Sequence, residues 1–195
     1  TTPANYFHAL RRQIHRDFRK PLVIMTPKSL LRNKLCVSNL EDFGKQNSFH
    51  RVLWDHATDP KENSFIKLKK SNKIRKVILC SGKVYFDLLE AREKLKKDDV
   101  VLIRIEQLYP FPVKSLVKEI KAYKNNAKFY WCQEEPKNMG AWFSVRDYIQ
   151  WTLDYIGANN NQISYIGRDT AASPATGYAK RHLSQQREII EKVFK

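Results

Sequence analysis

Several features that would assign a chain to a common class are scarce or missing from this 195-residue sequence. It contains three cysteines, Cys36, Cys80 and Cys132, whose odd number and wide spacing provide neither a disulfide framework nor a zinc-binding pattern. Cys80 and Cys132 lie inside apolar runs and are expected to be buried free thiols. No apolar run approaches the length of a membrane-spanning helix. These absences favour a protein of a reducing compartment, either the cytoplasm or an organelle matrix, with no membrane partner.

The sequence also lacks the short motifs of several enzyme classes. Residues 81–83, Ser-Gly-Lys, follow an apolar run, but a Walker loop needs two glycines and a Ser or Thr after the lysine, where Val84 stands. The three spaced glycines of a dinucleotide fingerprint are absent. None of the five histidines pairs with another histidine or a cysteine at metal-ligand spacing, and no nucleophile–histidine–acid order is present. The residues alone therefore predict no metal site and no catalytic constellation.

Acidic residues are few relative to basic ones. The chain has 36 Lys and Arg against 20 Asp and Glu, a formal net charge of +16. Such an excess suggests an acidic partner, and nucleic acid is the obvious candidate. The lysines are scattered, however, and their densest run, residues 61–76, has no interleaved aromatic residue except Phe65. We interpret the run as a solvated loop and keep a standalone nucleic-acid-binding module as the alternative.

What the sequence does contain is a regular alternation of strand and helix patterns from residue 76 onward. The expected strands are 76–80, 100–105, 128–135 and 162–167. The expected helices are 83–97, 112–123, 141–156 and 179–194. Four strand–helix pairs in succession predict an α/β domain with a mostly parallel sheet and helices on both faces.

The first part of the chain has a different organisation. Residues 3–18 are expected to form a helix, and the apolar run 21–27 a strand, whereas residues 28–75 mix short apolar patches with polar breaks. One helix and one strand cannot form a core of their own, so we expect the chain to be part of a longer protein. The predicted division is the end of a second α/β domain at 1–27, a connecting segment at 28–75 and a C-terminal α/β domain at 76–195.

Candidate site residues follow the expected strands, because α/β sheets place their ligands at the ends of strands. After the first strand, Ser81 is a possible helix N-cap, Gly82 a turn residue and Lys83 a cation at a helix N-terminus. This turn either caps the helix or holds an anion. Near the end of the third strand, Glu134 and Glu135 could carry out acid–base chemistry in a small self-sufficient enzyme, or form salt bridges.

Two further groups leave a structural and a binding role open. Arg104 and Glu106 share one face at the end of the second strand, where they either are structural or pair with a neighbouring domain. In the loop after the last strand, Arg168, Ser173 and Thr176 could meet an acidic partner or a phosphate. The small residues of that loop could equally serve close packing.

Long segments of the chain, in order, closely resemble the C-terminal portion of the thiamine-diphosphate-dependent first component of 2-oxoglutarate dehydrogenase complexes. The segments are 1–32, 80–92, 100–112, 131–142 and 167–182. The resemblance implies a transketolase C-terminal-like domain of a homodimeric oxidoreductase of the tricarboxylic acid cycle. It also implies that residues 1–27 end a pyrimidine-binding domain.

The resemblance carries expectations about chemistry as well. The family decarboxylates 2-oxoglutarate on thiamine diphosphate with Mg²⁺ and succinylates a lipoyl group of the dihydrolipoyl succinyltransferase. The Gly-Asp-Gly of its cofactor motif is absent here, and the Asn-rich residues 158–161 lack that partner. The chain alone is therefore expected to bind no cofactor and to be inactive.

Some members of the family have an allosteric acetyl-CoA site, and six residues of this chain lie in matching motifs. They are Thr26, Lys28, Arg32, Ser81, Lys83 and Gln133. The resemblance implies that they could line an anion-binding pocket at strand ends. The alternative is that they hold the domain against its neighbour.

Overall fold

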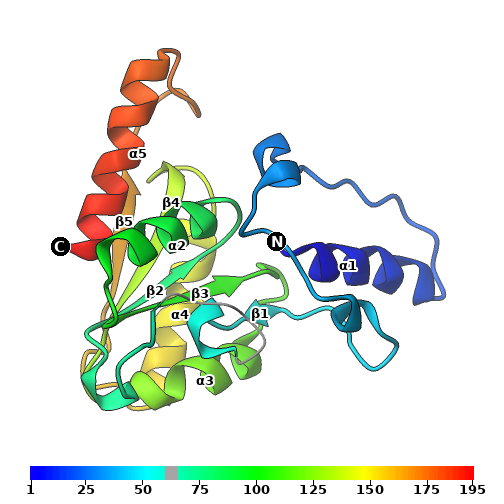
Figure 1. Cartoon of the computed structure of the whole chain (residues 1–195), viewed down its shortest axis with the longest axis horizontal. Coiled ribbons are helices and arrows are strands. Elements are labelled where there is room, and N and C mark those ends of the chain that lie inside the picture. The colour runs from blue at the N-terminus through cyan, green and yellow to red at the C-terminus, as the bar shows by residue number, and fades with distance from the viewer. Residues whose placement is uncertain (60–65) are drawn as a thin grey trace. The chain divides into compact units, whose positions relative to one another are not determined.

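The computed structural model describes residues 1–59 and 66–195, and the chain forms two compact units, Thr1–Arg51 and Val52–Lys195 (Figure 1). The part of the basic run that includes Phe65 lies outside the described residues. Among the residues that are described, no helix combines the length and the apolar character needed to cross a membrane.

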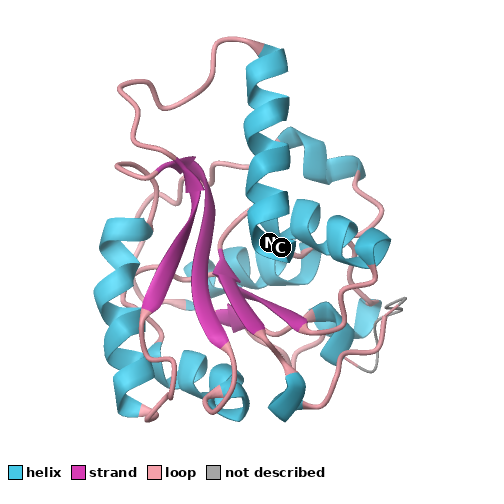
Figure 2. Cartoon of the chain, turned by 90° about the vertical axis from the view of Figure 1, so that its left-hand side faces the viewer, coloured by secondary structure: helices cyan, strands magenta, loops and turns pink. Residues whose placement is uncertain are grey.

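The larger unit is built on a five-stranded sheet in the order β1-β3-β2-β4-β5, whose strands are labelled in Figure 1 and drawn in magenta in Figure 2. The strands are β1 (Val52–Leu53), β2 (Lys76–Cys80), β3 (Val100–Ile105), β4 (Lys128–Pro136) and β5 (Ile163–Arg168). Strands β2 to β5 pair in parallel, and the short β1 runs antiparallel to β3. This confirms the predicted α/β class and the mostly parallel sheet.

Two pairs of helices cover the two faces of the sheet (Figures 1 and 2). Helices α2 (Val84–Leu95) and α5 (Ala179–Phe194) contact each other on one face, and α3 (Val113–Ile120) and α4 (Trp142–Tyr155) contact each other on the other. Central parallel strands are buried on both sides by such helices, which is why β2 and β3 are apolar along nearly their whole length. The prediction of helices on both faces is confirmed.

The strand interiors also hold the two buried thiols. Cys80 and Cys132 are paired neighbours on β2 and β4, and both are free and buried, as expected from their apolar surroundings. Burial raises the pKa of Cys80 to about 12 and raises the pKa of Cys132 well above its ordinary value. Both sulfur atoms therefore remain protonated thiols that pack as small apolar groups.

A buried ion pair ties α2 to the segment after β1. The Asp55 and Arg92 side chains are 1% and 0% exposed, and their two contacts measure 2.5 and 2.8 Å. Asp55 also accepts hydrogen bonds from the backbone N–H groups of Leu102 and Ala57. This carboxylate thereby joins three parts of the chain, and nothing in the sequence pattern pointed to it.

The boundary between the two units falls between Arg51 and Val52. It lies there because Val52 and Leu53 pair with Ile105 and Arg104 of β3 and so belong to the sheet. The three-part division at residues 27 and 75 concerns the domains of a longer protein and stays a prediction.

The smaller unit confirms one expected element and contradicts another. Helix α1 (Pro3–His15) forms as expected, with the Thr2 hydroxyl accepting a hydrogen bond from the Asn5 N–H as an N-cap. The strand expected over residues 21–27 is absent, and Val23 and Met25 are 79% and 89% exposed. An apolar run becomes a strand only beside a neighbouring strand, and no described residue of the chain provides one there.

Candidate functional site at the carboxyl edge of the sheet

The connections of the sheet create one point where ligand sites are commonly found. Strand β2 is followed by α2 and then by β3, which is its neighbour on one side. Strand β3 is followed by α3, on the other face of the sheet, and then by β4, which is the neighbour of β2 on its other side. Adjacent strands whose connections diverge leave a crevice beyond their carboxyl ends. A pocket of about 460 Å³ lies there, lined by the turns after β2 and β3, the end of β4 and the start of α4. We call it the carboxyl-edge pocket.

The Ser-Gly-Lys turn forms one wall of this pocket. Gly82 has φ +77°, a left-handed conformation that strains other residues, and a Cβ there would meet nothing within 4 Å. The predicted turn is thus confirmed. The predicted N-cap role of Ser81 is wrong, because α2 begins at Val84, the cap position is Lys83, and no side chain makes a capping hydrogen bond. Ser81 instead lines the pocket.

Lys83 is engaged by two carboxylates. Its Nζ lies 2.6 Å from Asp87 Oδ2, one turn along α2, and 3.0 Å from Glu134 Oε1 at the end of β4. Burial lowers the pKa of Lys83, but its hydrogen bonds to these two carboxylates raise it by more, so its pKa lies above the ordinary value. An anion that approached Lys83 would therefore compete with two carboxylates.

Gln133 is the structural centre of the turn after β4. The residue is 3% exposed, and its Oε1 accepts hydrogen bonds from Trp131 Nε1 (2.9 Å) and from the Trp142 backbone N–H (3.0 Å). Its Nε2 donates to the Met139 carbonyl at 2.7 Å. Gly140 has φ +66°, and a Cβ there would lie 2.9 Å from Nε2, so another residue would be strained and would displace this amide. The amide group is therefore occupied within the protein and positions the start of α4.

The two neighbouring glutamates face different surroundings. Glu134 reaches Lys83 on the α2 side of the sheet, whereas Glu135 lines the carboxyl-edge pocket. Successive residues of a strand point to opposite faces, and this separates the two carboxylates. The two carboxylates therefore do not form an acid–base pair. The hypothesis of a self-sufficient enzyme that uses such a pair receives no support from this arrangement.

Arg104 is buried next to this edge without a carboxylate partner among the described residues. It is 5% exposed, and its guanidinium carbon lies 3.9 Å from the centre of the Tyr85 ring. Its Nε and Nη1 atoms and Glu106 Oε1 have no hydrogen-bond partner within the described chain. The sequence did not predict the contact of Arg104 with the Tyr85 ring. A pairing of Arg104 or Glu106 with a neighbouring domain stays a prediction.

The six residues of the implied acetyl-CoA site are divided between the two units. Thr26, Lys28 and Arg32 are exposed in the unit Thr1–Arg51, where residues Lys28–Arg32 form a short 3₁₀ helix. Ser81, Lys83 and Gln133 belong to the unit Val52–Lys195. Within that unit Ser81 and Gln133 line one pocket, and Lys83 lies in the same turn as Ser81. The grouping of all six residues stays a prediction.

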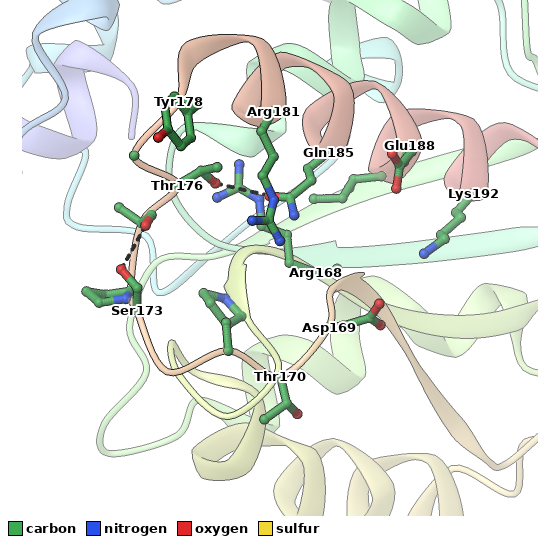
Figure 3. Close-up of a pocket in the computed structure, with 17 residues that line it drawn as sticks. Arg168, Asp169, Thr170, Ser173, Thr176, Tyr178, Arg181, Gln185, Glu188 and Lys192 are labelled. Carbon is green, nitrogen blue, oxygen red and sulfur yellow. Dashed lines mark hydrogen bonds between the residues drawn. The ribbon is translucent and has the colours of Figure 1, made fainter.

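The structure brings the three polar residues of the last loop together. Arg168, Ser173 and Thr176 line a second pocket, of about 360 Å³, between the loop after β5 and helix α5 (Figure 3). We call it the β5–α5 pocket. The sequence had left these residues open between packing and anion binding, and their convergence on one cavity favours binding.

The residues present do not fit the thiamine diphosphate and Mg²⁺ of the implied family. The Asn-rich turn between α4 and β5 is bonded to its own surroundings, with Asn159 and Asn160 donating to backbone carbonyls and Asn161 donating to Asp154. Among the described residues, no group of three His, Cys, Asp or Glu side chains could hold a metal ion. That this chain alone binds no cofactor stays a prediction.

Comparisons with known proteins agree with the resemblance in the sequence. The family model described as "2-oxoglutarate dehydrogenase C-terminal" matches residues 37–194. Over 191 residues the chain is 56% identical to a protein of Brucella anthropi named "2-oxoglutarate dehydrogenase E1 component", and likewise to the proteins of that name from Brucella ovis and Brucella canis. The matched region is 98% of this chain and 19% of each relative, so the chain spans about a fifth of their length. The nucleic-acid-binding alternative receives no support from these comparisons.

Proposed function

The chain belongs to the 2-oxoglutarate dehydrogenase C-terminal family, and from this we propose that it serves as the C-terminal domain of a 2-oxoglutarate dehydrogenase first component. Its role there is in assembly and regulation, and the chain has no catalysis of its own. The observation that carries this proposal is the 56% identity over 98% of the chain to proteins of which it covers 19%. The larger unit supports it further, because that unit has its own hydrophobic core.

The proposal places the chemistry in the rest of such a protein. There, thiamine diphosphate and Mg²⁺ would supply the decarboxylation of 2-oxoglutarate, and the succinyl group would pass to a lipoyl group of dihydrolipoyl succinyltransferase. The whole enzyme would work as a homodimer, in a bacterial cytoplasm or a mitochondrial matrix. This chain would contribute packing surfaces and a ligand pocket to that assembly.

The test of this role is the size and activity of the native polypeptide. An antibody raised against this chain should detect in source cells a polypeptide several times larger than 23.0 kDa. The isolated chain, supplied with thiamine diphosphate, Mg²⁺ and 2-oxoglutarate, should release no CO₂. A native band near 23.0 kDa together with turnover by the isolated chain would overturn the proposal.

For regulation, we propose that acetyl-CoA binds the chain through the six residues that the resemblance implies, three of which belong to the turns beside the carboxyl-edge pocket. Ser81 and Gly82 leave an open backbone turn there, and the pocket volume falls in the range of small-molecule sites. In the smaller unit Lys28 and Arg32 are exposed cations suited to phosphate groups, and Arg32 can bind a phosphate through two N–H groups. The fully bonded amide of Gln133 would shape the pocket and hold α4 in place.

Calorimetric titration of the chain with acetyl-CoA tests this assignment. Arg32→Gln should weaken binding about tenfold, whereas Arg19→Gln, an exposed arginine outside the six residues, should leave it within about twofold. Equal effects of the two substitutions, or no binding by the full-length enzyme, would favour the alternative that the six residues hold the domain against its neighbour.

A further inference from the structure

The β5–α5 pocket has the dimensions and the charge of a binding site. It lies between α5 and the loop 169–177, and its volume of about 360 Å³ is within the range of pockets that hold small molecules. It shares no lining residue with the carboxyl-edge pocket. Its role is therefore independent of the function proposed above.

Two arginines meet in this pocket. Arg168 extends from the end of β5 and Arg181 from the first turn of α5, and their side chains converge on the same part of the cavity (Figure 3). Neither forms a salt bridge with any residue in the described ranges 1–59 and 66–195. Two like charges that converge in one cavity repel each other, and an anion bound between them lowers that cost.

The hydrogen bonds of Arg168 leave part of its guanidinium unused. Its Nη2 lies 3.0 Å from His182 Nδ1 and 3.4 Å from Gln186 Oε1, while its buried Nε has no partner among the described residues. A guanidinium only donates hydrogen bonds, so His182 Nδ1 is the acceptor in this contact. Neither partner is a carboxylate, so they orient the Arg168 side chain without neutralising its charge.

The loop that closes the pocket is held by its own hydroxyl groups. Thr176 Oγ1 donates to Gln185 Oε1 at 3.0 Å, and Ser173 Oγ donates to the Ala175 carbonyl at 2.9 Å. These hydroxyl protons are therefore used in shaping the loop. The guanidinium groups of Arg168 and Arg181 are among the remaining hydrogen-bond donors in the lining.

The acidic residues of the pocket lie at its other end. Asp169, Glu188 and Lys192 line the side away from Ser173 and Thr176 (Figure 3). Ser184 donates a hydrogen bond to Glu188 at 3.2 Å. The two arginines lie between this side of the pocket and the side that Ser173 and Thr176 line (Figure 3).

We propose that the β5–α5 pocket binds a small oxyanion, the phosphate or carboxylate group of a small molecule, between Arg168 and Arg181. The planar guanidinium presents parallel N–H groups that match the oxygen atoms of either group. The observations that carry the proposal are the cavity itself and the convergence in it of two arginines that form no salt bridge with any described residue.

Titration of the purified chain with inorganic phosphate, and separately with sodium succinate, tests the proposal at a constant ionic strength set with chloride. Calorimetry should show saturable binding of at least one anion. Arg181→Gln should weaken that binding by about tenfold. Arg187→Gln removes the same charge from an exposed position of α5 outside the pocket, and it should change binding by less than about twofold.

The outcomes separate a site from general attraction to a basic protein. Saturation by phosphate alone or by succinate alone would support the site and identify the oxyanion, whereas no saturation by either would overturn it. Equal weakening by Arg181→Gln and Arg187→Gln would also overturn it, because net charge would then explain the binding. Arg181 is exposed, so its replacement should leave the fold intact. Circular dichroism of the Arg181→Gln variant checks this.

Discussion

The two units of the chain differ in what becomes of their apolar side chains. In the unit Val52–Lys195, strands β2 and β3 are buried along their whole length by helices on both faces. In the unit Thr1–Arg51, Val23, Met25 and Leu40 are largely exposed, although they are as apolar as the strand residues. An apolar pattern thus produced a buried element only where the chain also provides the surfaces that cover it.

This contrast bears on function. The larger unit can fold around its own core and holds both pockets described above. The smaller unit exposes apolar side chains that a soluble protein normally covers with a partner or another domain. The proposed place of the chain in a longer dehydrogenase is consistent with this difference, and substitutions in the two units can test it.

The largest effect is expected at the buried ion pair of the larger unit. Asp55→Ala would leave the Arg92 guanidinium uncompensated in the core and should lower the free energy of unfolding by about 3–5 kcal/mol. Urea denaturation followed by tryptophan fluorescence would measure it. Asp98→Ala removes an exposed partner of Lys69 and should cost less than about 1 kcal/mol. Similar losses in both variants would show that burial of the pair has little influence on stability.

A pair of identical substitutions compares the two units directly. Leu79→Ala, in fully buried β2, should lower the free energy of unfolding by about 2–5 kcal/mol through lost contacts and a cavity. Leu40→Ala, at a residue 90% exposed in the smaller unit, should change it by less than about 0.5 kcal/mol. A large loss at Leu40 in the same denaturation experiment would mean that this leucine is covered in solution, and the contrast between the units would fail.

Alkaline pH should lower the free energy of unfolding of the larger unit, because the phenol of Tyr85 is buried. Burial raises the pKa of this phenol to about 12, from an ordinary value of 10.0. The folded state thus keeps the proton while the unfolded state loses it. The contribution to stability is complete below pH 10 and is lost as the pH rises toward 12, by about 2–3 kcal/mol in total.

Melting temperatures measured across this pH range would reveal the effect. Tyr85→Phe should remove this part of the alkaline loss, whereas Tyr109→Phe, at an exposed residue, should leave it unchanged. An unaltered pH profile in Tyr85→Phe would show that other groups cause the loss.

The sequence predicted the larger unit well, because its strand and helix patterns follow one another along the chain. It predicted the turn at Gly82 for the same reason, since a turn depends on local residues. It did not predict the Asp55–Arg92 ion pair or the packing of the Arg104 guanidinium on the Tyr85 ring, because these contacts join segments that are distant in the sequence. It misassigned Ser81 as the cap, because α2 begins at Val84 and its cap position is Lys83, two residues after Ser81.

The smallest expected loss of stability is at Gln133, a buried polar side chain that orders the turn after β4. Gln133→Leu keeps the size of the side chain but leaves Trp131 Nε1, the Trp142 N–H and the Met139 carbonyl without their partner. Unsatisfied buried groups should lower the free energy of unfolding by about 1–3 kcal/mol. Hydrogen exchange at Trp142 should accelerate, because its amide then opens locally.

The exposed Gln162 provides the matched control, and Gln162→Leu should shift stability by less than about 0.5 kcal/mol. If Gln133→Leu proved neutral in denaturation and exchange, the turn after β4 would be held by apolar packing alone. A loss in the expected range would instead show that the larger unit also relies on a polar side chain to order the edge where its pocket lies.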